Sequence, residues 1–162
     1  MEIRQRKQNR IAEYDYSTNG AYFVTICTYQ RQRILSSIVG DGKPVPKPIG
    51  LIAESYIHQI PIKYPSIFVD NYVIMPDHIH ILLRIDSLAG TGNPSPTLGT
   101  VIGWYKYQLT KQVNLQCGTQ GQRLLQRSYY DHVIRNQQDY DEIWQYIENN
   151  PKSWLLKYHS QN

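Results

Sequence analysis

The pattern of apolar and polar positions predicts four strands. The segment AYFVTICTYQ is rich in β-branched and aromatic residues and predicts a first strand over residues 21–29. Farther along, IFVDNYVIM and HIHILLRI flank Pro76-Asp77, and because proline and aspartate suit turn positions, these segments predict a hairpin. A fourth strand is predicted within LLQRSYYDHVI. The Gly- and Pro-rich stretch VGDGKPVPKP should break regular structure.

Helical spacing appears in two segments between these strands. A first helix is predicted by apolar residues at spacings of three, four and four, namely Ile49, Ile52, Tyr56 and Ile60. Pro61 should end that helix, because proline lacks the backbone N–H that continues it. Residues 88–100 are rich in Gly, Pro, Ser and Thr and read as a loop, and VIGWYKYQLTKQVN after them predicts a second helix.

A third helix is predicted near the end of the sequence. Asn136 can cap it, with Asp139 three residues on as a variant of the capping box. The helix should run to about Asn150, because a residue before proline, here Pro151, is pushed out of the helical region. Its core-facing stripe is expected to be Tyr140, Ile143, Trp144 and Ile147.

The order strand, helix, strand, strand, helix, strand, with one added helix, predicts an α+β fold. We expect a ferredoxin-like core: a mainly antiparallel four-stranded sheet with helices on one face, plus the extra C-terminal helix. A length of 162 residues suits one domain, 1–162. Residues 1–15 read as a basic arm, either solvated or ordered by a ligand, that carries Arg4, Arg6, Lys7 and Arg10.

Composition narrows the class of protein. The formal charge of +4 and the pI of about 9.0 favour polyanionic partners. Two cysteines, Cys27 and Cys117, form no CxxC or Cys/His pair, so neither a zinc cage nor a disulfide framework is indicated. No apolar run is long enough for a membrane span and the start is basic and polar, so we expect a cytoplasmic protein without a membrane partner.

The second strand of the predicted hairpin carries a candidate metal site. In HIHILLRI the strand period of two puts the isoleucines on one face and His78 and His80 on the other. Histidines at i and i+2 lie roughly 6.6 Å apart along a strand, close enough to hold one ion. Two solvent-facing or hydrogen-bonded histidines are the alternative, and an isolated HxH motif does not exclude it.

The last predicted helix supplies a candidate nucleophile and a third ligand. Tyr146 lies beside the apolar stripe, and Asn150 lies one turn later on the same face. Two imidazoles and an amide oxygen suit Mn²⁺ or Mg²⁺ and would leave the full charge of the ion to polarise a phosphate. Asn149 could replace Asn150, and Tyr146 and Asn150 could instead be an edge-of-core tyrosine and a helix C-cap.

Three segments in this order, PDHIHILL, RSYYDHVIRN and QYIENNP, resemble the IS200/IS605-type single-tyrosine (Y1) HUH transposases, and most closely the REP-associated tyrosine transposases. The early NRIAEYDYSTNGAYFVTICT and the segment YPSIFVDNYVIMPDHIH are also similar to that group, so the resemblance covers most of the chain. Insertion-sequence members often carry glutamine where Asn150 stands here, which is a departure from their pattern.

The resemblance implies a catalytic role for Tyr146 and a metal site formed by His78, His80 and Asn150. It implies that Tyr146 attacks a phosphate of single-stranded DNA bearing a hairpin, forming a 5′-phosphotyrosine and releasing a 3′-hydroxyl, and that rejoining reverses these steps. It also implies a homodimer, which associates with the nucleoid when bound to DNA. In the second helix, Gly103 and Lys106 match positions of the group, with Lys106 meeting DNA phosphate.

Further basic and aromatic residues could line a DNA path. Arginines could contact the backbone, and a tyrosine from the fourth strand could stack on unpaired bases. Tyr129 and Tyr130 point to opposite faces of that strand, so one of them could approach the histidines. The candidates, besides the arm and Lys106, are Arg123, Arg127, Tyr129, Tyr130 and Arg135. The alternative is a solvated face.

Two other functions fit the sequence. One is a catalytically silent module that binds DNA or RNA hairpins, which would bind tightly without metal and cleave nothing. The other is a small metal-dependent hydrolase in which water is the nucleophile. Conversion of Tyr146 to phenylalanine would leave turnover by such a hydrolase almost intact.

Overall fold

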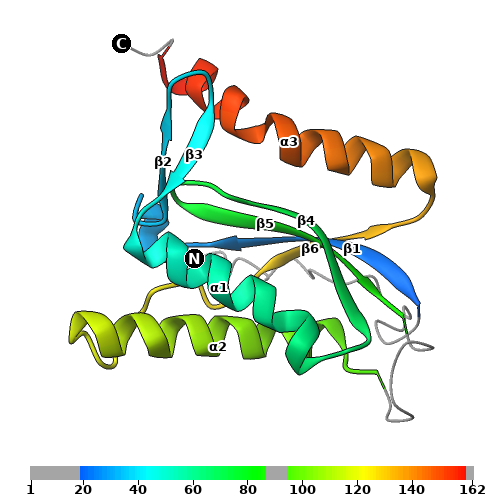
Figure 1. Ribbon diagram of the computed structural model, residues 1–162, viewed down its shortest axis with the longest axis horizontal. Helices are drawn as coiled ribbons and strands as arrows, with labels where there is room; N and C mark the ends of the chain where they lie inside the picture. The colour runs from blue at the N-terminus through cyan, green and yellow to red at the C-terminus, as the bar shows by residue number, and fades with distance from the viewer. Residues whose placement is uncertain (1–18, 87–94, 160–162) are drawn as a thin grey trace, which may run out of the picture.

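The computed structural model describes residues 19–86 and 95–159. The basic arm expected over residues 1–15 lies outside these ranges. One four-stranded sheet forms the centre of the molecule, with its strands in the spatial order β4-β5-β1-β6 (Figure 1). Their bounds are Gly20–Cys27 for β1, Ile67–Ile74 for β4, His78–Ile85 for β5 and Tyr130–Ile134 for β6. The helices are α1 (Pro48–Lys63), α2 (Leu98–Cys117) and α3 (Gln137–His159), and a short 3-10 turn, η1, covers Tyr29–Arg31.

All neighbouring strands of this sheet are antiparallel. The first strand of the core lies inside the sheet, flanked by the third and the fourth, which is the ferredoxin-like arrangement that the order of elements predicted. The register places Thr25 opposite His80 and Cys27 opposite His78. Because side chains of paired residues point to the same face of a sheet, β1 carries the side chains that surround the two histidines.

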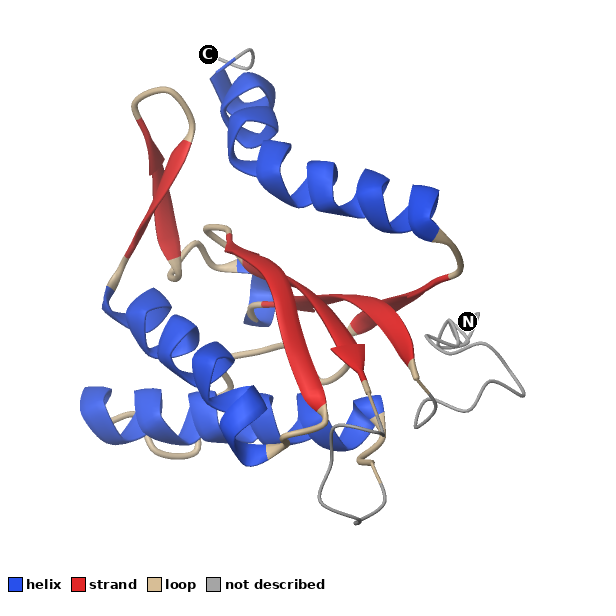
Figure 2. Ribbon diagram, turned by 45° about the vertical axis from the view of Figure 1, so that its right-hand side comes forward, coloured by secondary structure: helices blue, strands red, loops and turns tan. Residues whose placement is uncertain are grey.

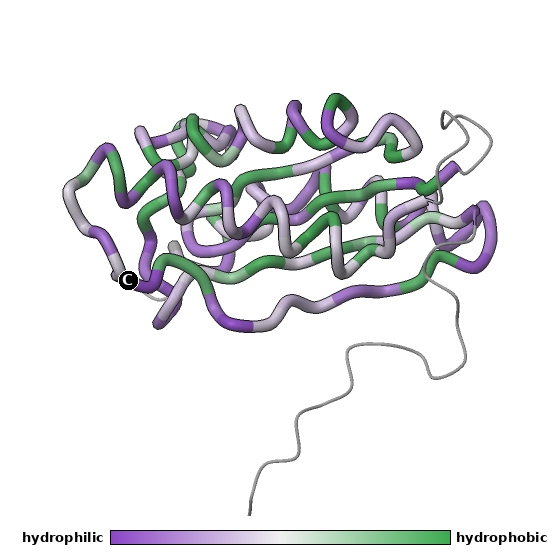
Figure 3. Tube along the Cα trace, turned by 90° about the horizontal axis from the view of Figure 1, so that it is seen from below, coloured by the Kyte–Doolittle hydropathy of each residue, from purple (hydrophilic) through white to green (hydrophobic). Residues whose placement is uncertain are grey.

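The two faces of the sheet are covered by different helices. Figures 1 and 2 show α1 and α2 on one side of the sheet and α3 on the other. The larger core lies under α1 and α2 and includes the alternate β5 residues Ile79, Ile81, Leu83 and Ile85. Figure 3, seen from below, shows long hydrophobic stretches along the extended segments of the chain. The predicted alternation in β5 is therefore confirmed, whereas the position of the extra helix α3 on the opposite face is a finding of the structure.

The face opposite α1 and α2 carries a smaller core under α3. Ile147, fully covered, packs there with Val73, Met75 and Leu82. The expected helix stripe is confirmed, because Tyr140, Ile143 and Trp144 contact the same cluster. Covering this face buries His78 and His80, which would otherwise face solvent.

The stretch expected to break regular structure forms a hairpin instead, made of β2 (Ser36–Val39) and β3 (Lys43–Pro46). Gly40 and Gly42 have positive φ angles of 59° and 103°, which let the chain reverse between the two strands. A Cβ on Gly42 would lie 3.0 Å from the Cα of Lys152, so only glycine lets the hairpin approach α3 this closely. The Gly and Pro content that indicated irregular structure therefore serves a tight turn and a close approach.

Both prolines expected to end helices lie inside them. Pro61 lies within α1, which continues to Lys63 because the buried side chain of Ile60 anchors this turn and the carbonyl of Ile60 accepts a bond from the Tyr64 N–H at 2.9 Å. Pro151 lies within α3, which continues to His159. Figure 2 shows α3 bending toward its C-terminal end, as proline inside a helix makes it do.

The last turns of α3 are held by tertiary contacts that the sequence did not reveal. The Arg33 guanidinium lies 5.2 Å from the ring centre of Trp154 and 4.4 Å from that of Tyr158. Cation–π contacts of this kind contribute about 0.5–1 kcal/mol at exposed sites. They favour continuation of the helix past Pro151, so that Trp154, Lys157 and Tyr158 are also part of α3.

Side chains cap the N-terminal ends of α3 and α2. Asn136 caps α3 by accepting a bond from the Asp139 N–H at 2.8 Å, as predicted, while Asp139 accepts from the Arg135 N–H at 3.2 Å. The expected loop over residues 88–100 is shorter at its C-terminal end, because Thr97 caps α2 and the helix begins at Leu98. Within residues 19–86 and 95–159, no helix has both the length and the apolar character needed to cross a membrane.

The burial difference between two isoleucines of α1 gives a stability prediction. Ile57 is fully buried, whereas Ile62 is 78% exposed. Ile57→Ala should therefore lower the free energy of unfolding by about 3 kcal/mol, through lost burial and a residual cavity. Ile62→Ala, the matched control, should change it by less than about 0.5 kcal/mol. Urea unfolding followed by circular dichroism measures both, and equal effects would contradict the described packing of α1.

Candidate functional site

A cavity of about 340 Å³ between the sheet and α3 brings together the four residues that the sequence singled out. His78 and His80 reach it from β5, and Tyr146 and Asn150 reach it from α3. The remaining lining residues are Thr25, Arg31, Ser153, Trp154, Lys157 and Tyr158. Asn149 does not line this cavity and is exposed, so the structure brings Asn150 rather than Asn149 to the histidines.

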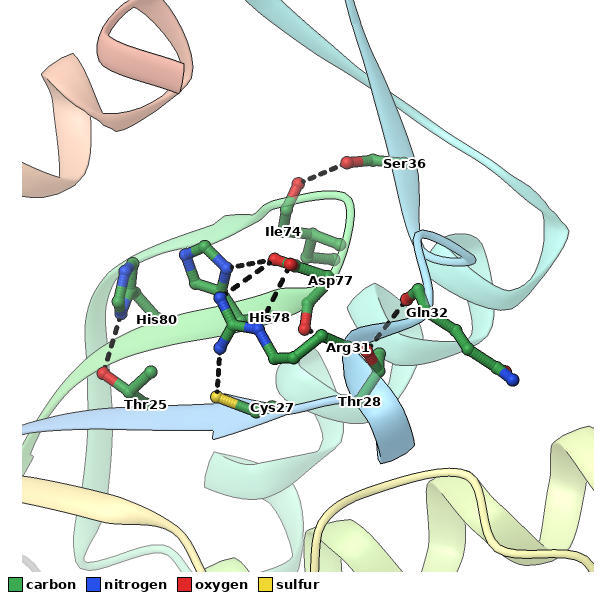
Figure 4. Close-up of polar contacts among 10 residues, drawn as sticks. All are labelled: Thr25, Cys27, Thr28, Arg31, Gln32, Ser36, Ile74, Asp77, His78 and His80. Carbon is green, nitrogen blue, oxygen red and sulfur yellow. Dashed lines mark hydrogen bonds and ion pairs between the residues drawn. The ribbon is translucent and has the colours of Figure 1, made fainter. Parts of the chain in front are cut away.

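Each histidine is oriented through its Nδ1 atom. The Asp77 carboxylate accepts a bond from His78 Nδ1 at 2.7 Å, and the Thr25 hydroxyl lies 2.9 Å from His80 Nδ1 (Figure 4). When Nδ1 carries the proton, the lone pair is on Nε2, the usual metal-binding arrangement. His80 Nε2 is buried and has no hydrogen-bond partner within the described ranges. A buried polar atom without a partner is the exception in folded proteins, and a bound ion is one of the few explanations.

Burial keeps both imidazoles neutral. Burial, together with the proximity of His78 and Arg31, lowers the pKa of His80 to about 3. Burial also lowers the pKa of His78, although the Asp77 carboxylate and the Asn150 side chain, which is within hydrogen-bonding reach, act in the opposite direction. Neutral imidazole is the form that binds a metal ion. The two side chains are therefore ready to act as ligands near pH 7.

Arg31 was not among the candidates from the sequence, yet it lines the same cavity. Its guanidinium lies 3.2 Å from Asp77 Oδ2 through Nε and donates to the Cys27 Sγ atom at 2.8 Å through Nη1 (Figure 4). Gln30 and Arg31 have positive φ angles of 55° and 54°, which non-glycine residues rarely adopt and which cost about 1–3 kcal/mol each. This strained backbone holds the arginine against Asp77, with half of its side chain exposed.

Asp77 therefore contacts both a metal-ligand candidate and a cation. Its carboxylate is buried and joins His78 to Arg31. Burial, opposed by Arg31, raises the pKa of the Cys27 thiol, so this cysteine is a neutral contact in the network rather than a reactive thiolate.

Tyr146 lies beside His80 on the opposite wall of the cavity. The ring centres of the two residues are 5.5 Å apart, and the Phe23 ring, stacked on His80 at 4.9 Å, meets the Tyr146 ring edge-on at 5.9 Å. These ring contacts anchor Tyr146. The residue is nevertheless 52% exposed, so a substrate can reach its hydroxyl. Ile147, the next residue, is buried under the sheet and fixes this turn of α3.

The donor atoms can hold a divalent cation with mixed ligands, but they do not form a cysteine zinc cage. No group of three or more His, Cys, Asp and Glu side chains suited to a metal occurs in the part of the chain that the structure describes. The available set is two imidazole nitrogens and the amide oxygen of Asn150. Mixed nitrogen and oxygen ligands of this kind suit Mn²⁺ or Mg²⁺.

The other predicted nucleic-acid residues are spread over the molecule. Lys106 is on α2, across the sheet, and its ammonium donates to the carbonyls of Gln126 and Arg127 at 2.7 and 2.9 Å. Tyr129 packs against the core under α1 and α2, whereas Tyr130 is exposed and pairs with Thr25, in the row that contains His80.

The three candidate arginines of the described residues also lie in different places. Arg123 lies over the ring of Tyr29, at 5.2 Å from its centre. Arg127 is exposed, and Arg135 lines a different cavity near the start of α3. Arg4, Arg6, Lys7 and Arg10 lie outside the described ranges.

Sequence reasoning missed six of the ten residues that line the cavity, and it missed Asp77, which orients His78 from behind. Asp77 could have been found, since it directly precedes His78. Thr25 could not, because only the pairing of β1 with β5 puts it beside His80. Trp154, Lys157 and Tyr158 were missed because Pro151 was expected to end the helix.

No protein-family model matches the chain. An uncharacterized protein from Haemophilus influenzae is 28% identical over 167 residues, which cover 94% of this chain and 91% of that protein. The structure of a REP-associated tyrosine transposase bound to a REP hairpin superposes with a TM-score of 0.58 and 22% identity, over 87% of this chain and 73% of the other. A solved structure from Deinococcus radiodurans has a TM-score of 0.48 and 20% identity, over 86% and 95% of the two chains. The first superposition shows that this chain shares the fold of the hairpin-bound transposase.

Proposed function

We propose that this protein is a metal-dependent transposase that cleaves and rejoins single-stranded DNA carrying a hairpin, with Tyr146 as the nucleophile. The observation that carries the proposal is the cavity in which an accessible tyrosine faces two buried, neutral histidines and an asparagine. The fold shared with a transposase that was solved bound to a REP hairpin supports a DNA hairpin as the substrate.

In the proposed reaction, the Tyr146 oxygen forms a bond to phosphorus, and the bond from phosphorus to the 3′-oxygen breaks. The phenolic proton is lost to solvent, the departing 3′-oxygen gains a proton, and the products are a 5′-phosphotyrosine and a free 3′-hydroxyl. Attack by a 3′-hydroxyl on the phosphotyrosine rejoins a strand. The covalent link conserves the energy of the phosphoester bond, so rejoining needs no nucleoside triphosphate.

The metal site would be formed by His78, His80 and Asn150. A bound Mg²⁺ or Mn²⁺ supplies positive charge that polarises the phosphate. A tyrosine hydroxyl is almost fully protonated near pH 7, so it needs neighbouring positive charge to react. Arg31 adds a fixed cation in the same cavity, where it can bind a phosphate oxygen while Asp77 holds it in place.

The experiment that tests this function incubates the protein with Mn²⁺ or Mg²⁺ and a labelled single-stranded hairpin taken from beside its own gene. A denaturing gel should show a covalent protein–DNA band that disappears when EDTA removes the metal. A native-gel shift without any covalent band, across a set of neighbouring hairpins, would favour the silent binding module. Release of cleaved DNA without a covalent band would favour a hydrolase that uses water.

Asp77 gives a prediction about metal affinity. Asp77→Asn should weaken Mn²⁺ binding by about 10–100-fold, because the carboxylate that orients His78 and increases its basicity is lost. Isothermal titration calorimetry with Mn²⁺ measures this effect, and circular dichroism checks the fold. Asp141→Asn, which removes one exposed carboxylate from α3, should leave the affinity unchanged. Equal affinities for the two variants would show that Asp77 does not support the metal site.

A further inference from the structure

A second and larger cavity, of about 610 Å³, lies on the same face of the sheet at the N-terminal end of α3. Its polar and aromatic lining comes from β4, β5, the segment between β6 and α3, and α3 itself, and it includes Asp70, Arg84, Arg135, Gln137, Tyr140 and Trp144. Nothing in the proposed cleavage reaction uses these residues.

A fixed polar cluster forms one wall of this cavity. A single oxygen of Asp70, Oδ2, accepts bonds from Arg84 Nε and from the Tyr140 hydroxyl, both at 2.6 Å. Burial and Asp70 raise the pKa of Tyr140 to about 12, so its hydroxyl remains a donor. The Arg84 guanidinium also lies 5.0 Å from the centre of the Phe68 ring. Arg84 is therefore held through Nε, and within residues 19–86 and 95–159 its two amino groups make no hydrogen bond, so they can donate to a ligand.

The remaining walls provide two neighbouring aromatic rings and an additional positive charge. The rings of Tyr140 and Trp144 lie 6.2 Å apart and are tilted by 33°, and both contact the smaller core through part of their surface. Among residues 19–86 and 95–159, no carboxylate pairs with the Arg135 guanidinium. Asp70 is already neutralised by Arg84. The cavity consequently combines aromatic side chains with a net positive charge, the combination that binds unpaired nucleotides.

This cavity is adjacent to the candidate cleavage site along the same groove. Tyr140 and Tyr146 are six positions apart on α3, which corresponds to about 9 Å along the helix axis. On β1, alternate residues facing α3 lead from Thr25 at the histidines, past Phe23, to Ala21 at the second cavity. A single strand that places a phosphate at Tyr146 can therefore extend a neighbouring nucleotide into the second cavity.

We propose that this cavity is a nucleotide subsite that binds one unpaired base of the DNA strand near the cleaved phosphate, with a preference for guanine. The inference rests on the proposed function, because it takes the strand at Tyr146 to be DNA. The base contacts Tyr140 and Trp144, and the amino groups of Arg84 and Arg135 donate hydrogen bonds to it. Arginine donates to two adjacent acceptors, and guanine presents such a pair at O6 and N7, whereas adenine presents N7 beside an amino group.

The test measures binding of four labelled pentanucleotides, d(TTGTT), d(TTATT), d(TTCTT) and d(TTTTT), to the full-length protein by fluorescence anisotropy in Mn²⁺. We expect d(TTGTT) to bind most tightly. Arg135→Gln should weaken its binding about tenfold, which corresponds to about 1.4 kcal/mol, and should reduce the preference for guanine. Lys111→Gln removes the same charge from the opposite side of the molecule, on α2, and should have little effect.

A second readout locates the bound base. The indole N–H signal of Trp144, assigned by its loss in Trp144→Phe, should shift when d(TTGTT) is added, while the signal of Trp104, on α2, should not. An unshifted Trp144 signal would overturn the proposal. So would an equal weakening of all four probes by Arg135→Gln, because that result indicates a phosphate contact without base recognition.

These outcomes are separable from failure of the cleavage function. Binding of pentanucleotides requires no covalent step, so a guanine preference that depends on Arg135 would support the subsite even if no protein–DNA band ever formed. Conversely, a covalent band together with pentanucleotide binding that ignores Arg135 and Trp144 would support cleavage and exclude this subsite.

Discussion

Replacing Tyr146 by phenylalanine should abolish the covalent protein–DNA band while leaving the fold and the hairpin shift on a native gel intact. The substitution removes only the oxygen that is proposed to attack phosphorus. The ring contacts with Phe23 and His80 remain. Loss of a catalytic nucleophile lowers the rate by at least ~10³-fold in comparable enzymes. The free energy of unfolding should change by less than about 0.5 kcal/mol, because Tyr146 is half exposed.

Two other tyrosines provide matched controls for this experiment. Tyr158 lines the same cavity, and Tyr130 belongs to the strand row that contains His80. Tyr158→Phe and Tyr130→Phe should both retain the covalent band. If the band persists in Tyr146→Phe and is lost in one of the two controls, the tyrosine replaced in that control is the nucleophile.

Replacing His80 by alanine should remove both metal binding and the covalent band. His80 is buried, neutral and oriented by Thr25, and its Nε2 atom has no partner within the described part of the chain. Loss of one of two imidazole ligands should weaken Mn²⁺ binding by more than about a hundredfold, because changing even an outer-shell partner costs 10–100-fold. Calorimetry with Mn²⁺ and the gel assay measure the two effects separately.

The control for His80→Ala is His58→Ala, which removes an exposed imidazole from α1 on the opposite side of the sheet. This variant should bind Mn²⁺ and form the band like the wild type. Full metal affinity in His80→Ala would remove this residue from the proposed ligand set. A band that forms normally in EDTA would contradict metal dependence as a whole.

Local periodicity was sufficient to predict the main elements and the separation of their faces. In β5 the period of two put the isoleucines and the histidines on opposite faces, and the structure confirms this. On α3 the spacing of four put Tyr146 and Asn150 on one face, and both line the candidate cavity. These relations depend only on residues a few positions apart, so the backbone geometry of a strand or a helix fixes them.

Predictions based on single breaker residues were less successful. Pro61 and Pro151 were expected to end helices, and the glycines and prolines between Val39 and Pro48 were expected to prevent regular structure. In each case distant contacts offset the local cost: burial of Ile60, the stacking of Arg33 on Trp154 and Tyr158, and the close approach of Gly42 to α3. Local propensity is a weak determinant when tertiary packing opposes it.

The sequence by itself determined the four strands of the main sheet, the presence of the three helices and the cap at Asn136. It also determined that His78 and His80 share one face of a strand and that Tyr146 and Asn150 share one face of a helix. Only the tertiary structure decided that α3 lies over the histidine face, that burial keeps both imidazoles neutral, and that Thr25 and the Asp77–Arg31 pair orient and flank them. The reason is physical: strand register and helix packing join segments 50 or more residues apart, as Thr25 and His80 are, and no local pattern encodes such contacts.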